Sequence, residues 1–550
     1  MQNNTFLGYW TGGGVRPEPY AEIIAEVIQD VLQPIYLVNK NNDIHVAING
    51  NVEISPAKSM SASAATKDRL PLLAVVPPLP PESLGDPYFK SKLGLRYAYV
   101  VGAMANGITS VEMVEAAARA GMVGFFGAAG LDVIKIEAAI GQLKKRLGRL
   151  PYGFNLIHSP ADPEQEFATV RLYIQNNINL ISASAFMDLT PSLVYYRVKG
   201  IRRDANGRVI CPNRVIGKVS REEVARRFFS PPPSKIVNGL QEKGLISAEE
   251  AALSAHVPMA DMLTAEADSG GHTDNRPALS LFPTIAALRN QLAEKHGYGM
   301  PLPIGLGGGI ATPEAVSAAF SMGAAYVLTG SIHQACVESG TSDLVRRMLA
   351  QAGQADVAMA PAADMFEMGV KVQVLKRGTM FPLRAAKLYD LYSRHVAWES
   401  IQAKDRAMLE KDYFRRPFDE EWEQTRSFFQ RRDPSQIEKA ESDPRHKMAL
   451  VFRSYLGQSS NWANSGEPSR QMDYQIWCGP SIGAFNAWTK DTFLESAGSR
   501  KTDEVAMNLL LGAAALTRSR QLMQQGIRLP NTACQYVPKP LAEIKRLLRC

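Results

Sequence analysis

Short apolar runs alternate with segments of helical periodicity along the middle of the chain. Each run is short enough for one strand, and the segments between them repeat apolar residues every three or four positions, as one face of a helix does. The runs predict strands at residues 97–103, 121–127, 152–157, 179–185, 214–219, 259–265, 302–305 and 325–328. The segments predict helices at residues 110–120, 132–147, 163–176, 221–229 and 313–322. About eight strand–helix repeats favour a closed, TIM-type (β/α)8 barrel of the α/β class over an open doubly wound sheet.

The first part of the chain has a different pattern and predicts a small α+β module at residues 1–75. A helix is expected at 19–31. Apolar runs at 35–38 and 44–48 flank the turn residues NND at 41–43, and this spacing is typical of a β-hairpin.

Two changes in composition indicate a linker between this module and the barrel. Residues 55–66 are rich in Ser and Ala, and residues 77–81 form the proline cluster PPLPP. Such stretches are typical of connecting segments. We therefore assign a linker to 76–96 and the barrel to 97–342.

Two further regions are predicted to be helical. One interrupts the barrel at about 230–257, where SAEE at 247–250 resembles a capping box. The other begins after Ser331, and we assign 343–550 as a mainly helical C-terminal region. Its apolar helices are suited to cover a substrate, although ordinary helix packing predicts the same pattern.

The overall composition is that of a globular protein. Hydrophobic residues make up 45% of the 550 residues and charged residues 21%, so disorder is not expected. The 61 basic and 54 acidic residues give a net charge of +7 that is spread along the chain. The short arginine pairs lack interleaved aromatic residues, which argues against nucleic-acid binding. A docking surface for an acidic carrier protein is a more useful interpretation, although ordinary solvated faces explain most of these charges.

Cysteine spacing and apolar run length exclude other classes. The five cysteines are scattered without the paired spacing of zinc or redox sites, and the other metal motifs are missing too, so no metal is expected. The first residues lack a basic n-region, and the longest apolar run, around 509–516, is too short to span a bilayer. We therefore expect a cytoplasmic protein without a membrane span, and a homodimer as the commonest assembly of such a barrel.

Two glycine-rich loops follow the last two predicted strands. In barrels of this type these loops commonly hold a phosphate, which binds free backbone N–H groups and the positive end of a helix. Pro313 marks a favourable helix start directly after the first loop. A tight turn explains one glycine cluster equally well, but two at consecutive strand ends predict a phosphate site. The candidate residues are Gly307, Gly308, Gly309, Gly330 and Ser331.

The ends of three other strands offer groups that suit a flavin ring. The first strand ends in Gly102, Ala103 and Met104, which let the backbone approach a ring edge. Asn155 ends the third strand with an amide that both donates and accepts, although a turn residue is the alternative. Lys218 near the end of the fifth strand would stabilise the anionic reduced ring at its N1/O2 edge, unless its side chain extends to solvent.

The stretch EADSGGHTDNRP at 266–277 contains the most informative candidate, His272. Gly270 and Gly271 permit an unusual backbone at the end of the sixth strand, and an imidazole exchanges protons near neutral pH. A catalytic or substrate-polarising role is therefore predicted, although lone histidines are more often structural. The polar residues around His272 have two interpretations, a hydrogen bond to His272 or to a flavin on one side and simple loop capping on the other. These residues are Glu266, Asp268, Asp274 and Asn275.

These motifs, in this order, resemble the flavin barrels of the nitronate monooxygenase and bacterial enoyl reductase superfamily. The motifs are GAM at 102–104, FN at 154–155, SGGH at 269–272, GGGI at 307–310 and TGS at 329–331. The longer string through Pro277 resembles the trans-acting enoyl reductases of polyketide and polyunsaturated fatty acid synthases, the PfaD type. The N-terminal module, the helical insertion and the helical C-terminal region also fit that subgroup.

The resemblance implies an FMN-dependent enoyl reductase that acts in trans. Such an enzyme takes a hydride from NADPH or NADH and reduces a 2-enoyl thioester on an acyl carrier protein, and His272 would polarise or protonate the substrate. Two alternatives remain: a nitronate monooxygenase that consumes oxygen, and a non-catalytic scaffold component of a synthase. Monooxygenase relatives commonly have a proline before the methionine of GAM and a small or apolar residue in place of Lys218. Both departures weaken the transfer of nitronate chemistry.

Overall fold

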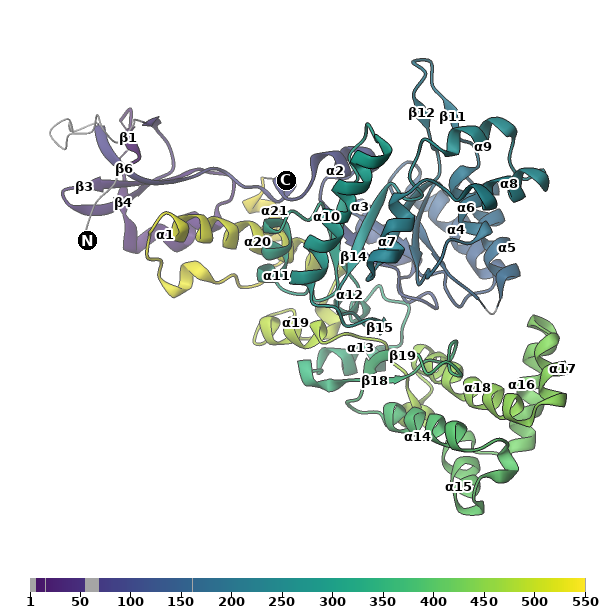
Figure 1. The fold of residues 1–550 in the computed structure, drawn as a ribbon. Helices are drawn as coiled ribbons and strands as arrows, with labels where there is room; N and C mark the ends of the chain where they lie inside the picture. Colours follow the sequence, from purple (N-terminus) through teal and green to yellow (C-terminus); the bar gives the residue numbers. More distant parts are fainter. Residues whose placement is uncertain (1–5, 15, 55–68, 161, 550) are drawn as a thin grey trace.

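A closed parallel barrel lies at the centre of the computed structural model, which describes residues 6–14, 16–54, 69–160 and 162–549 (Figure 1). The strands close in the order β10-β13-β14-β16-β17-β7-β8-β9. Their bounds are β7 Tyr99–Val101, β8 Val123–Phe126, β9 Gly153–Ile157, β10 Leu180–Ser184, β13 Arg214–Val219, β14 Met262–Glu266, β16 Ile304–Gly307 and β17 Val327–Thr329. Each predicted strand overlaps one of these, so the predicted (β/α)8 barrel is confirmed.

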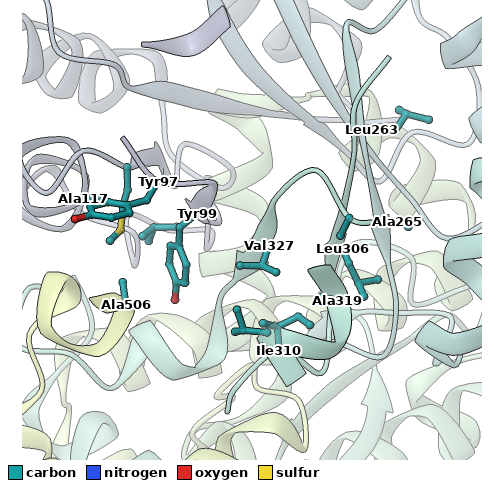
Figure 2. Packing of buried hydrophobic residues seen from close by; sticks show 14 of the residues in the cluster. Tyr97, Tyr99, Ala117, Leu263, Ala265, Leu306, Ile310, Ala319, Val327 and Ala506 are labelled. Atoms are coloured by element: carbon teal, nitrogen blue, oxygen red, sulfur yellow. The ribbon is translucent and has the colours of Figure 1, made fainter. Parts of the chain in front are cut away.

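Both faces of the barrel strands are buried, which explains why they appear in the sequence as continuous apolar runs. Alternate side chains such as Val100, Ile216 and Met262 fill the barrel interior. Their neighbours pack outward against the helices, as Figure 2 shows for Leu306 and Val327, which belong to one large buried cluster. This period of two fixes which side chains reach the barrel mouth.

Helix α2 (Pro87–Leu93) closes the N-terminal end of the barrel. The ring of Phe89 stacks on Tyr326 with their centroids 4.2 Å apart, and Phe89 and Leu93 join the interior cluster. Part of the predicted linker at 76–96 is therefore a packed element. Its start signal was an Asp86 N-cap followed by Pro87, which the neighbouring prolines obscured. The predicted linker at 55–66 lies outside the described residues.

Helices surround the barrel, and all five that the periodicity predicted are present. Helices α6 and α10 were not predicted, because Pro191 and the internal Pro283 are typical of helix boundaries. The insertion contains two helices, and the expected capping box forms between Ser247 and Glu250. The bounds are α3 Val111–Arg119, α4 Val133–Leu147, α5 Pro163–Gln175, α6 Pro191–Val198, α7 Glu222–Phe229, α8 Ser234–Glu242, α9 Ala248–Ser254, α10 Ala278–His296, α11 Pro313–Ser321 and α12 Ser331–Gln334, with a hairpin of β11 Arg202–Arg203 and β12 Val209–Ile210.

The N-terminal module is a six-stranded sheet with one helix, and the predicted helix and hairpin are both present. The strand order is β2-β4-β3-β6-β1-β5. The long helix α20 (Thr502–Gln524) packs against α1 of the module and against α3 and α11 of the barrel. Helix α20 therefore connects the N-terminal module to the barrel. The bounds are β1 Gly8–Thr11, β2 Glu18–Pro19, α1 Tyr20–Gln29, β3 Ile35–Lys40, β4 Asp43–Ala47, β5 Asn51–Ile54 and β6 Arg69–Val76.

The C-terminal region contains a helical subdomain, which we define as α14 to α18, with a core of its own around Phe366, Phe414 and Tyr455. In Figure 1 this subdomain lies below the barrel, with β15, β18 and β19 between the two. The predicted helices are present, but the prediction missed β18 and β19, which form a three-stranded sheet with β15. The bounds are β15 Gly271–His272, α13 Asp343–Ala350, β18 Val357–Pro361, β19 Lys371–Leu375, α14 Phe381–Arg394, α15 Ala403–Met408, α16 Phe418–Arg432, α17 Ser435–Ser442, α18 Pro444–Ser465, α19 Ser481–Thr489 and α21 Leu541–Leu547. Across the described ranges, no helix is both long and apolar enough to cross a membrane.

Candidate active site

The carboxyl ends of the barrel strands form a mouth with two unlike halves. Strand alternation turns polar side chains inward on four adjoining strands and glycines inward on the other four. The polar positions, on β9, β10, β13 and β14, are Asn155, Ser182, Lys218 and Glu266. The glycine positions, at or just beyond the ends of β16, β17, β7 and β8, are Gly307, Gly330, Gly102 and Gly127. One half therefore offers polar side chains, and the other offers backbone groups, with open space at Gly330, where an added Cβ would meet nothing within 4 Å.

Lys218 and Glu266 meet inside the polar half. The Lys218 Nζ lies 2.8 Å from Glu266 Oε1, and the Ser269 hydroxyl donates to the same oxygen at 3.3 Å. Because Lys218 is mostly buried and faces inward, the alternative of a lysine extended to solvent is wrong. The pair places a cation and an anion side by side at the mouth.

His272 is held by a carboxylate from outside the barrel. Its Nε2 lies 3.1 Å from Oδ1 of Asp364, which belongs to the loop between β18 and β19. Burial disfavours protonation of the imidazole, but the hydrogen bond and charge of Asp364, aided by Glu266, outweigh burial and raise the pKa of His272 above its ordinary value. The histidine is thus suited to donate a proton, and its partner was not predicted.

The two glycines before His272 allow backbone arrangements that a side chain would prevent. Gly271 has a φ of +76°, which favours glycine. A Cβ on Gly270 would lie 2.6 Å from the backbone of Cys478, so this glycine lets residues 476–479 pack against the loop. That returning segment also places the Gly479 N–H 3.0 Å from the Ser331 hydroxyl oxygen, which accepts its hydrogen bond. The segment at 476–479 therefore links the loop of His272 to the loop of Ser331, and this link was not predicted.

The residues around His272 anchor their loop. Asp274 accepts hydrogen bonds from Arg221, with which it forms an ion pair, and from Ser220; chiefly the Arg221 contact lowers the pKa of Asp274 to about 2. Gln373 of β19 donates to the Asp268 carboxylate at 2.9 Å and to the Ser269 carbonyl at 2.8 Å. Loop anchoring, rather than contact with His272, is therefore the observed role of the two aspartates.

The glycine loops after β16 and β17 leave backbone donors free. Among the described residues, the N–H groups of Gly309, Ile310 and Ser331 have no protein acceptor. A Cβ on Gly309 would meet nothing within 4 Å, and the same holds for Gly330. Helix α11 starts just beyond, with Thr312 as its N-cap and Pro313 in its first turn. The residues thus form a small cradle of N–H donors that fits a phosphate.

The first loop of the mouth is fixed by Thr109. The hydroxyl of Thr109 donates to the Gly102 carbonyl and accepts from the Met104 N–H, and the Gly102 N–H donates to Thr329. Both backbone groups of Gly102 are therefore occupied within the protein. Of the three predicted residues of this loop, Ala103 is the one whose N–H and carbonyl both lack a protein partner among the described residues.

Asn155 lies beside a small cavity on the polar half. Its side-chain oxygen accepts the N–H groups of Ala128 and Ala129 at 2.7 and 3.2 Å, which leaves its amide nitrogen for a ligand. The cavity, of about 50 Å³, is also lined by Arg432 of α16. Arg432 Nε donates to Asp162 Oδ2 at 3.0 Å and so ties the helical subdomain to the barrel. The neighbouring Ser182 hydroxyl is buried and has no partner in the described part of the chain.

Side chains that could ligate a metal are dispersed through the structure. Within the described ranges, no three His, Cys, Asp or Glu side chains gather as a metal site would require. At the mouth, Glu266 and His272 have their own partners in Lys218 and Asp364.

Comparison with known proteins places the barrel in a named family and finds a second family model that is similar to part of the helical subdomain. The family model described as nitronate monooxygenase matches residues 89–404, which is more than half of the chain. A second model, described as the inserted helical domain of [acyl-carrier-protein] S-malonyltransferase, matches residues 395–474. The second match covers α15 to α18, the larger part of the helical subdomain.

Three relatives refine this assignment. The chain is 41% identical to the enoyl reductase domain of MlnA from the macrolactin biosynthesis cluster of Bacillus amyloliquefaciens, with a TM-score of 0.77 over 80% of this chain and 99% of that domain. It is 45% identical to a polyunsaturated fatty acid synthase component of Thraustochytrium sp. over 82% of this chain, and 45% identical to polyketide biosynthesis protein PksE of Bacillus subtilis over 84%. The matches span only 30% and 60% of those two proteins. The chain belongs to the nitronate monooxygenase family of oxidoreductases, in the group of enoyl reductases related to polyketide and polyunsaturated fatty acid synthases.

Proposed function

We propose that the chain is an FMN-dependent enoyl reductase that acts in trans. It would use NADPH to reduce 2-enoyl thioesters on an acyl carrier protein during polyunsaturated fatty acid or polyketide biosynthesis. The observation that carries the proposal is the two-sided mouth, with free N–H donors on one half and Lys218, Asn155 and His272 on the other. The names of the relatives, which include a synthase component and an enoyl reductase domain, support the substrate class.

The residues of the mouth fit FMN. The cradle of Gly309, Ile310 and Ser331 suits its phosphate, because their three N–H groups have no acceptor in the described part of the chain and would bind an anion. Lys218 suits the ring edge that gains negative charge on reduction. When bound, FMN supplies hydride transfer from a nicotinamide to the β-carbon of the thioester.

The protein's own groups complete the reaction. The Asp364 carboxylate forms a hydrogen bond with Nε2 of His272, so Nδ1 is the ring nitrogen left to face a substrate. A protonated His272 donates its proton towards the α-carbon or the thioester oxygen as charge develops there. The helical subdomain, tied to the barrel through Arg432, excludes water from the mouth.

Nitronate oxidation is the second candidate, because the matching family model has that name. A non-catalytic scaffold is the third, and the ion pair and histidine–carboxylate pair kept at the mouth argue against it. The location in the cytoplasm and the homodimer remain predictions from the sequence.

Steady-state assays separate these candidates. The protein, reconstituted with FMN, is given NADPH or NADH with a crotonyl thioester of pantetheine or of a carrier protein, and separately a nitroalkane in air. We expect a saturated thioester, and the two nicotinamide cofactors are compared in the same assay. Oxygen uptake with the nitroalkane and no thioester reduction would favour nitronate oxidation, and inactivity in both assays with FMN bound would favour the scaffold.

A further inference from the structure

The side-chain partner of His272 comes from the C-terminal region. Asp364 follows β18, and its hydrogen bond to His272 connects residues 92 positions apart. Gly271 and His272 pair with Gln373 and Val372 of β19, so the backbone on both sides of the hydrogen bond belongs to one small sheet. The imidazole is thus oriented by residues that lie beyond the barrel.

The loop that carries Asp364 is fixed to the helical subdomain. Arg453 of α18 donates from Nε to the Ala363 carbonyl at 2.9 Å and from Nη1 to Glu367 Oε1 at 3.1 Å. Phe366 of the same loop is fully buried in the core of the subdomain, where its ring lies edge-on to Tyr389. These contacts flank Asp364 on both sides and set its position.

We propose that Asp364 is the positioning residue of His272, and that the helical subdomain, acting through Arg453 and this loop, orients the histidine by holding a carboxylate against its Nε2. The inference rests on the proposed function for the role of His272 as proton donor. It adds that His272 is positioned as a proton donor only when the helical subdomain is docked against the barrel.

The charges around the histidine agree with this assignment. Asp364 and Glu266 favour the imidazolium, whereas burial and Lys218 oppose it, and the pKa of His272 is raised overall. The Asp364 side chain is 56% exposed; partial desolvation favours its neutral form, but His272 and Arg453 outweigh this effect and lower the pKa of Asp364. Arg453 therefore supports the carboxylate as well as its loop.

The test measures the titration of His272 in the FMN-loaded protein by NMR with ¹³C-labelled histidine, and the signal is assigned with a His272→Gln variant. In Asp364→Asn we expect the midpoint of His272 to move to lower pH and the alkaline limb of the kcat profile to move with it. At pH 8 we expect kcat to fall roughly tenfold, the size of a lost hydrogen bond between charged groups. The KM for NADPH should stay unchanged, and Asp364→Glu should recover part of both effects. An unchanged titration and pH profile in Asp364→Asn would overturn the proposal.

A second pair of variants tests the path through the subdomain. Arg453→Gln removes the bonds to the loop without touching His272, and we expect a shift in the same direction as for Asp364→Asn but smaller. Arg432→Gln is the matched control, because it breaks a different contact between subdomain and barrel, the one with Asp162. If both arginine variants shift His272 equally, or neither does, the path through Arg453 is wrong. The titration of His272 needs no turnover, so its result does not depend on enoyl reduction. A failure of the proposed function can therefore be distinguished from a failure of this inference.

Discussion

The Lys218 ammonium and the Glu266 carboxylate lie 2.8 Å apart on neighbouring strands β13 and β14, at the mouth of the barrel. This pair keeps a cation inside a largely enclosed site without leaving it unpaired. A cation that faces a ring gaining negative charge stabilises the reduced form, by an amount of order 1–4 kcal/mol at contact distance.

Removal of this cation should make bound FMN harder to reduce. We expect Lys218→Met to lower the midpoint potential of the bound flavin and to slow its reduction by NADPH about tenfold. Potentiometric titration and stopped-flow absorbance measure the two effects. Lys218→Arg keeps the charge and is the control, and an unchanged potential in Lys218→Met would remove Lys218 from the cofactor site.

Loss of His272 should affect the substrate half of the reaction alone. His272→Ala is expected to lower enoyl reduction by about 10²- to 10⁴-fold, the usual contribution of a general acid. The rate at which NADPH reduces the bound flavin should change little, because His272 has no part in that step. Single-turnover measurements of the two half-reactions check this, and full thioester turnover in the variant contradicts the assignment.

The glycine cradle predicts a contrast between stability and FMN affinity. Gly309 has a φ of +74° and a Cβ there would meet no protein atom, so Gly309→Ala should cost only about 1–2 kcal/mol of folding free energy. If the phosphate binds there, FMN affinity should fall at least about tenfold, as measured by fluorescence titration of the apoprotein. Gly323→Ala at the other end of α11 is matched in strain, with a φ of +92° and open space, and should leave FMN affinity unchanged. Equal affinities in both variants would place the phosphate elsewhere.

The anchor of the histidine loop predicts a pH-dependent stability. The pKa of Asp274 is lowered to about 2, chiefly by Arg221. A lowered folded-state pKa adds stability above the unfolded-state value near 4, and this stability disappears as the pH falls from about 4 to 2. Because Arg221 is partly exposed, we expect Asp274→Asn to lower the free energy of unfolding by only about 1–2 kcal/mol at pH 7. Urea titrations should show the two proteins converging near pH 2, and a difference that persists there would point to another cause.

The barrel was predictable because its determinants are local. A strand buried on both faces leaves a short apolar run, and a helix leaves a repeat of three or four, so both appear in the order of the chain. The glycine loops were also predictable from the local sequence, because glycine is the residue that most readily adopts a positive φ. Gly308 and Gly309 both have a positive φ in the structure. The helix α10 had no such clear pattern: it contains Pro283, and tertiary packing keeps one helix across a residue that usually ends it.

The partners of the site were not predictable, because they come from distant parts of the chain. Nothing near His272 in the sequence points to Asp364, and residues 476–479 have no pattern that places them beside Gly270. Gln373 gave the one usable signal, since it is the polar residue in the middle of the apolar strand KVQVL. A buried amide there needs partners, and it finds them in Asp268 and Ser269.

Anaerobic half-reactions measure directly whether the reduced flavin transfers its electrons to an enoyl thioester. The purified protein is loaded with FMN, reduced with one equivalent of NADPH without oxygen, and mixed with a crotonyl thioester of an acyl carrier protein. We predict that the flavin absorbance returns at the rate at which butyryl thioester appears, with one product formed for each flavin reoxidised. A flavin that stays reduced with the thioester, in a protein that consumes oxygen when given a nitroalkane without NADPH, would contradict this prediction.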